Sequence, residues 1–289
     1  MNPALSFLAG GLRARHSLGS TMFTRWLLNT LPVELAAGWR IVRTDLGLWL
    51  VVAMFPGLMT AAAARAEGGP SARLGLLTIL ALVLLSMLAI VKFDAAAHGR
   101  RLPLDDTLGR ALRRILPYLA AFASVALITL GAGWLAEEGV LIATRGTPVS
   151  TFAAAAVSTV IYLSLLVRYA FWPYLAVLDR RPDLDRQAVA YGTWMAPLAA
   201  VGWPLMASSA MTAGYRWRLA PYVVLMGLGP SLTAAAPPAL RPPLATLWWI
   251  VQLTLQAVIF NHYRNRLGVV GVEQGKALAD QARGSPSSS

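Results

Sequence analysis

The sequence contains no cysteine, and only 13% of its 289 residues are charged. The absence of cysteine excludes disulfide bonds, thiolate metal sites and cysteine nucleophiles. A soluble globular domain carries about 25% charged residues. Half that share, together with 57% hydrophobic residues, excludes an ordinary soluble domain and indicates a polytopic membrane protein.

Acidic residues and lysine are also scarce. The chain has 13 Asp and Glu against 25 Lys and Arg, a formal net charge of +12, and all but two of the basic residues are arginine. Arginine binds phosphate groups more readily than lysine does. In so apolar a chain, we expect this charge to face the anionic surface of a membrane. The sequence therefore predicts membrane lipids, mainly anionic ones, as partners and predicts no nucleic-acid partner.

Uncharged runs mark the candidate transmembrane spans. A helix needs roughly 17 to 25 apolar residues to cross the hydrocarbon core of a bilayer. Seven runs have about this length, and the fourth continues past Arg168. They cover residues 46–64, 74–91, 115–136, 146–178, 187–215, 219–240 and 242–263.

The run 219–240 is the weakest of the seven, because it contains or borders four prolines. Proline removes a helix hydrogen bond, so we expect a break at Gly229–Pro230. Short cytoplasmic loops collect lysine and arginine. Six spans with both termini inside place 18 basic residues inside and 6 outside, whereas seven spans give 15 and 9. The sequence therefore predicts six spans, with 219–240 external, re-entrant or half-buried.

The predicted fold is an all-α, polytopic membrane helix bundle with three parts. Residues 1–45 form a cytoplasmic tail, residues 46–263 the six-span domain, and residues 264–289 a cytoplasmic, largely disordered tail. The first tail is predicted to hold an amphipathic helix lying in the membrane interface, with packing on the bundle as an equal alternative. The apolar residues at helical spacing there are Met22, Phe23, Trp26, Leu27 and Leu31. The expected location is a bacterial inner membrane, with both termini cytoplasmic.

No catalytic signature is present. The sequence has no metalloprotease, serine-hydrolase, P-loop or dinucleotide-binding motif, so we expect a protein that is not an enzyme and has no cofactor. Asp94 and His98 have the spacing to share a metal on one helix face. A solvated polar helix end explains that pair more simply, and no metal site is predicted.

Arg168 is the most informative residue, because a cation inside a span is costly and usually marks function. It lies eleven residues before Asp179, about 16 Å along a helix, with no carboxylate at its depth. Gln252 and Gln256 share one face of the last span at a similar depth. Their amides could hold the guanidinium without neutralising it, which leaves room for an anion such as a lipid phosphate. The predicted ligand-binding residues are therefore Arg168, Gln252 and Gln256.

Two alternatives stay open at this point. Arg168 could instead be structural, satisfied by backbone carbonyls freed at Pro173 or snorkelling inward. For the whole chain, the first hypothesis is a protein that binds or moves an anionic, lipid-like ligand near Arg168. The second is a scaffold or accessory subunit that packs against a larger membrane protein complex.

Several segments resemble a known family. They are LPVELAAGWRIVRTDLGLWL from Leu31, RALRRILPYL before the third span, RYAFWPYLAVLD at 168–179, AVAYGTW at 188–194 and NHYRNRL at 261–267. Their order resembles the six-span membrane domain of bacterial glycerophosphodiester phosphodiesterases and its stand-alone uncharacterised relatives. The resemblance implies a six-span fold. It implies no catalytic residues, because hydrolysis in the fused relatives belongs to a separate soluble domain.

Overall fold

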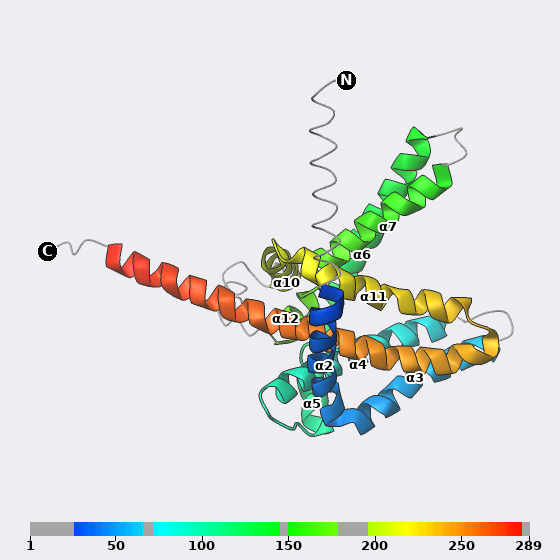
Figure 1. The fold of residues 1–289 in the computed structure, drawn as a ribbon, viewed down its shortest axis with the longest axis horizontal. Helices are drawn as coiled ribbons and strands as arrows, with labels where there is room; N and C mark the ends of the chain where they lie inside the picture. The colour runs from blue at the N-terminus through cyan, green and yellow to red at the C-terminus, as the bar shows by residue number, and fades with distance from the viewer. Residues whose placement is uncertain (1–25, 66–71, 145–149, 179–195, 285–289) are drawn as a thin grey trace.

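The fold is that of a computed structural model, which describes residues 26–65, 72–144, 150–178 and 196–284 (Figure 1). All regular elements in these ranges are helical, so the all-α prediction is confirmed. The elements are η1 (Trp26–Thr30), α2 (Leu31–Val42), η2 (Arg43–Asp45), α3 (Leu46–Arg65), α4 (Ala72–Ala97), α5 (Leu104–Leu112), α6 (Ile115–Ala143), α7 (Ser150–Arg168), α8 (Trp172–Leu178), α10 (Ala196–Thr212), α11 (Arg216–Ala235), η3 (Pro238–Leu240) and α12 (Arg241–Gly284).

Four stretches of helix are long and apolar enough to cross a membrane. Within the described residues they are Thr78–Ala97, Ile115–Ala143, Thr151–Leu178 and Pro238–Gly268. They correspond to the second, third, fourth and last of the runs found in the sequence. Four such helices are consistent with a multi-pass membrane protein.

The same order of elements occurs three times along the chain. A leading helix turns through a short bend into one long helix, which is followed by a second: α2–α3–α4, α5–α6–α7 and α10–α11–α12. The three bends are η2, Arg113–Arg114 and Ala213–Tyr215, where Gly214 has a φ of 71° that suits glycine. In Figure 1 the far ends of α3, α6 and α11 all lie toward the right of the molecule. We call the pair α6–α7, whose two helices pack along each other, the α6–α7 hairpin.

Helix α12 forms the centre of the bundle, and α2, α3 and α11 pack along it. The approach of α2 is close, because a Cβ added to Gly38 would lie 2.7 Å from the Thr254 carbonyl oxygen. A Cβ added to Gly57 of α3 would lie 2.3 Å from Thr246 Oγ1. Small residues let helices approach in this way. The described part of the N-terminal segment therefore packs on the bundle.

Helix α11 differs from the prediction for 219–240. It is continuous for 20 residues with Pro221 and Pro230 inside it, so the expected break at Gly229–Pro230 is wrong. Each proline removes one N–H from the helix, and packing against α7 and α12 compensates for that loss. Gly229 also permits the ring of Trp248 to lie directly against the backbone. The helix stops at Ala235, just before the Pro237–Pro238 pair.

Helix α12 continues past the last apolar run as far as Gly284. The expectation of a largely disordered tail from residue 264 is therefore wrong for residues 264–284, whereas 285–289 lie outside the described residues. The segment is polar, but it contains good helix formers and no proline before Pro286. In Figure 1 its last turns extend beyond the other helices.

Candidate functional site

A helix break separates α7 from α8 and determines what surrounds Arg168. Pro173 has no N–H, and the Trp172 N–H donates to the Tyr169 carbonyl at 3.1 Å. The freed backbone groups find partners on α10. The Thr212 hydroxyl donates to the Arg168 carbonyl at 2.8 Å, and the Phe171 N–H donates to Ser208 Oγ at 3.1 Å. Helix α10 thus completes the hydrogen bonding of the break.

The Arg168 side chain points toward α10. Its Nε donates to Ser209 Oγ at 2.7 Å, and the residue is exposed. Among the described residues, no direct hydrogen bond joins the guanidinium to Gln252 or Gln256, and the helices leave the Arg168 side chain uncovered. A similar predicted depth in the membrane was not sufficient to bring these side chains together, because Arg168 and the two glutamines face different neighbours.

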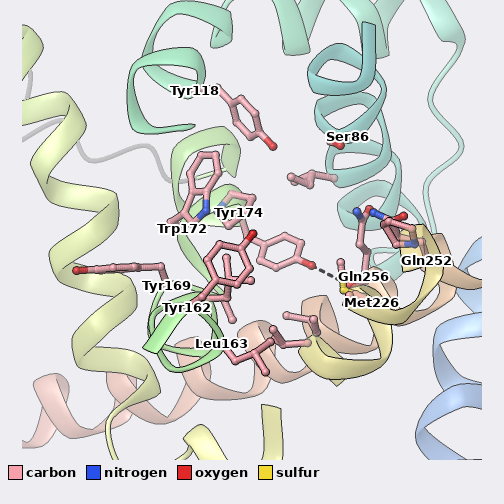
Figure 2. Close-up of a pocket in the computed structure, with 18 residues that line it drawn as sticks. Ser86, Tyr118, Tyr162, Leu163, Tyr169, Trp172, Tyr174, Met226, Gln252 and Gln256 are labelled. Carbon is pink, nitrogen blue, oxygen red and sulfur yellow. Dashed lines mark hydrogen bonds between the residues drawn. The ribbon is translucent and has the colours of Figure 1, made fainter. Parts of the chain in front are cut away.

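Gln252 and Gln256 line a cavity of about 420 Å³ between α4, α6, α7, α8, α11 and α12 (Figure 2). We call it the Tyr–Gln cavity. Its wall is Ser86, Ile90, Tyr118, Tyr162, Leu163, Leu166, Tyr169, Ala170, Trp172, Pro173, Tyr174, Val223, Met226, Gly227, Pro230, Gln252, Gln256 and Ile259. The structure therefore brings the two glutamines together in one cavity, and Arg168 is not part of its wall.

Tyrosine hydroxyls supply much of the polarity of this cavity. Figure 2 shows the hydroxyls of Tyr118, Tyr162 and Tyr174 pointing into it, with Gln252 and Gln256 on the opposite side. The Tyr174 hydroxyl donates to the backbone carbonyl of Gln256 at 2.7 Å. Tyr118 is buried, and its ring centroid lies 4.8 Å from that of Trp172. The wall carries no formal charge, so the cavity is polar but neutral.

A second hollow of about 490 Å³ adjoins the cavity, and the two share Tyr162, Leu163 and Gly227. We call it the α6–α7–α11 groove after the helices that form it. Its other lining residues are Thr129, Leu130, Gly133, Trp134, Glu137, Ser158, Thr159, Val224 and Leu228. Both hollows are mostly apolar in surface, and the cavity carries the larger share of polar groups. A neutral cavity with several polar groups therefore adjoins a more apolar groove.

A separate polar cluster joins α2 to α11 and α12. His262 Nε2 lies 3.4 Å from Glu34 Oε2, and the Tyr222 hydroxyl donates to the same carboxylate. His262 Nδ1 lies 2.6 Å from the Tyr215 hydroxyl. The side chain of His262 is 7% exposed and that of Glu34 is 26% exposed. This cluster is a tie between elements from opposite ends of the sequence.

The Asp94–His98 pair is present at the C-terminal end of α4. His98 Nδ1 lies 3.3 Å from Asp94 Oδ1, and both side chains are partly exposed. Neighbouring Lys92 is not solvated, because it is buried, pairs with Asp45 at 3.2 Å and donates to the Leu102 carbonyl. Among the described residues, no group of three or more histidine, aspartate or glutamate side chains is placed to hold a metal.

The chain was also compared with known proteins. No family model, no curated protein and no solved structure matches it. The resemblance to the phosphodiesterase membrane domain therefore stays a prediction.

Sequence reasoning missed most of the cavity wall. Tyr118, Tyr162 and Tyr174 are hydroxyl-bearing residues within otherwise apolar runs, and that signal was in the sequence. The prediction of the site considered charged residues and their amide partners, so it did not include these tyrosines. The Glu34–His262 pair had no such signal, because the two residues are 228 positions apart in the sequence.

Proposed function

We propose that this chain is a non-enzymatic integral membrane protein that binds or moves a lipid-like ligand. The observation that carries the proposal is that the Tyr–Gln cavity adjoins the α6–α7–α11 groove and shares lining residues with it. Ligand sites are typically concave and mostly apolar, with a few convergent polar groups. A cavity that holds tyrosine hydroxyls and glutamine amides, beside a more apolar groove, fits an amphipathic molecule with its head group in the cavity and an acyl chain in the groove.

The shape of the bundle supports access from the side. In Figure 1 the α6–α7 hairpin diverges from α11 and α12 toward its far end. The groove lies on the α11-facing side of this hairpin, and several of its lining residues are exposed, among them Leu130, Trp134 and Leu228. A lipid could therefore reach the cavity from the bilayer without first entering water.

We further propose six spans, formed by α3, α4, α6, α7–α8, α11 and α12, in a bacterial inner membrane with both termini cytoplasmic. Here α11 replaces 187–215 as the fifth span, since its 20 residues extend about 30 Å. The change moves Arg216 and Arg218 to the cytoplasmic side. The basic residues then divide 20 inside to 4 outside, with Arg168 in neither group, which is more asymmetric than 18 to 6.

Single cysteines test this topology directly, because the chain has none of its own. Ala213→Cys, in the bend before α11 and exposed, should be protected from a membrane-impermeant maleimide in intact cells. Pro237→Cys, after α11, should react with it. Both should react after the membrane is permeabilised. External labelling of both sites would instead restore 187–215 as the fifth span.

Lipid binding is tested by filling the junction of cavity and groove. Gly227 lines both, and a Cβ added there meets nothing within 4 Å. Gly227→Trp should therefore be tolerated by the fold and should lower lipid occupancy about tenfold, equivalent to 1.4 kcal/mol. Occupancy is measured by native mass spectrometry after gentle detergent extraction, supported by photo-crosslinking with a diazirine-bearing lipid.

The matched control is Gly131→Trp on α6, where an added Cβ also meets nothing within 4 Å and which lines neither hollow. It should leave lipid occupancy unchanged. Equal occupancy in both variants, with crosslinks outside the cavity and groove, would contradict the proposal. A stoichiometric protein copurifying in place of lipid would favour the scaffold or accessory-subunit alternative.

A further inference from the structure

We infer that the Tyr–Gln cavity selects a lipid whose head group is uncharged and bears hydroxyls, as in a monoglycosyl diacylglycerol. This inference rests on the proposed function and names the ligand class of the same site. It also departs from the anionic ligand that the sequence predicts near Arg168.

The first argument is electrostatic. None of the 18 residues of the cavity wall is Asp, Glu, Lys, Arg or His. A phosphate placed there would leave water without meeting a counter-charge, and burying an unpaired charge is costly. The charged residue of the adjoining groove is Glu137, a carboxylate that disfavours an anion further. Arg168 cannot compensate from the wall, because its side chain is directed to Ser209 on α10.

The second argument concerns hydrogen bonding. The Gln252 and Gln256 amides and the hydroxyls of Tyr118 and Tyr162 can each donate and accept hydrogen bonds. The Tyr174 hydroxyl, which donates to the Gln256 backbone carbonyl, can still accept one. Hydroxyl groups of a sugar or polyol have the same dual character, so they can pair with such a wall in either direction. Phosphate oxygens only accept when ionised and would leave the amide oxygens of both glutamines without donors. The composition of the wall therefore matches hydroxyls better than phosphate.

The third argument concerns shape. Tyr118 and Trp172 place two aromatic rings in contact at the wall, and Tyr162 and Tyr174 add two more. Flat aromatic faces pack well against the C–H face of a sugar ring, because that face is apolar while the ring edge carries the hydroxyls. The cavity, at about 420 Å³, falls in the ordinary range of small-molecule sites, about 300 to 1,000 Å³.

The test uses the full chain in lipid nanodiscs and two probes with the same acyl chains. Monogalactosyl diacylglycerol offers hydroxyls without charge, and phosphatidylglycerol offers hydroxyls with a negative charge. We expect the neutral lipid to bind at least tenfold more tightly by native mass spectrometry. Gln256→Leu should remove most of that preference. Arg168→Gln, which lies outside the cavity wall, should leave it unchanged.

A variant with a charge in the cavity wall distinguishes a misfolded protein from one that has changed its lipid preference. Gln252→Arg should reverse the preference by at least tenfold toward phosphatidylglycerol, a gain that a misfolded protein would not show. Equal or tighter binding of phosphatidylglycerol by the unmodified chain, lost in Gln256→Leu, would overturn the neutral head group yet leave lipid binding standing. If neither lipid binds and Gly227→Trp changes nothing, both this inference and the proposed function are wrong.

Discussion

Replacing Glu34 with leucine is expected to lower the free energy of unfolding by about 1 to 3 kcal/mol. A buried polar group left without its hydrogen-bond partner costs about that much, and Glu34 accepts the hydrogen bond of the Tyr222 hydroxyl beside His262. The substitution leaves buried His262 without its carboxylate and Tyr222 without its acceptor. Glu34→Gln, which keeps an acceptor for Tyr222, should cost less than Glu34→Leu.

The measurement is thermal or denaturant unfolding in a mild detergent, with helix content followed by circular dichroism. Asp94→Leu is a matched control, since Asp94 also pairs with a histidine at a similar distance, 3.3 against 3.4 Å. His98 is 47% exposed, against 7% for His262, so loss of the Asp94–His98 pair should cost below about 1 kcal/mol. Equal costs for Asp94→Leu and Glu34→Leu would show that burial does not strengthen the Glu34–His262 tie.

Removing both hydroxyls that complete the α7–α8 break is expected to cost about 2 to 5 kcal/mol. The double variant Ser208→Ala/Thr212→Val preserves apolar volume but leaves the Phe171 N–H and the Arg168 carbonyl without their α10 partners. A buried, unsatisfied polar group costs about 1 to 3 kcal/mol. Ser208 and Thr212 are both fully buried, so water cannot readily replace them.

The control for this variant is Ser209→Ala on the same helix. Among the described residues, the Ser209 hydroxyl bonds only the exposed side chain of Arg168, so its loss should change the unfolding free energy by less than about 1 kcal/mol. The same unfolding measurement applies to both variants. A larger effect from Ser209→Ala than from the double variant would mean that the Arg168 side chain, not the backbone break, holds α10 in place.

The helical class and most helix positions could be predicted from the sequence, because long uncharged runs leave little alternative in a membrane. The continuous helix in 219–240 could not be predicted from the sequence. The prediction of a break assumed that the prolines of this segment face lipid. In the structure α11 packs between α7 and α12, where the hydrogen bonds lost at the prolines are tolerated. The helix after residue 264 was missed for a related reason, since low hydropathy was taken to indicate disorder.

The candidate site was predicted in part. Gln252 and Gln256 were found because two amides four residues apart must share a helix face, a local property of α12. In the described part of the chain Arg168 does not hydrogen-bond them directly, because its direction depends on the break before Pro173 and on hydroxyls some 40 residues later. The tyrosine wall assembles from α6, α7 and α8. No short-range pattern encodes which of these helices meet.

The central position of α12 has a consequence for the making of the protein. The first long helices are synthesised early, yet α2 and α3 pack along α12, which lies much later in the sequence. Their close-fitting glycines, Gly38 and Gly57, have no surface to meet until α12 has been made. Pairings between distant parts of a chain form slowly. We therefore expect the faces of α2 and α3 that carry these glycines to stay uncovered during synthesis until α12 is inserted.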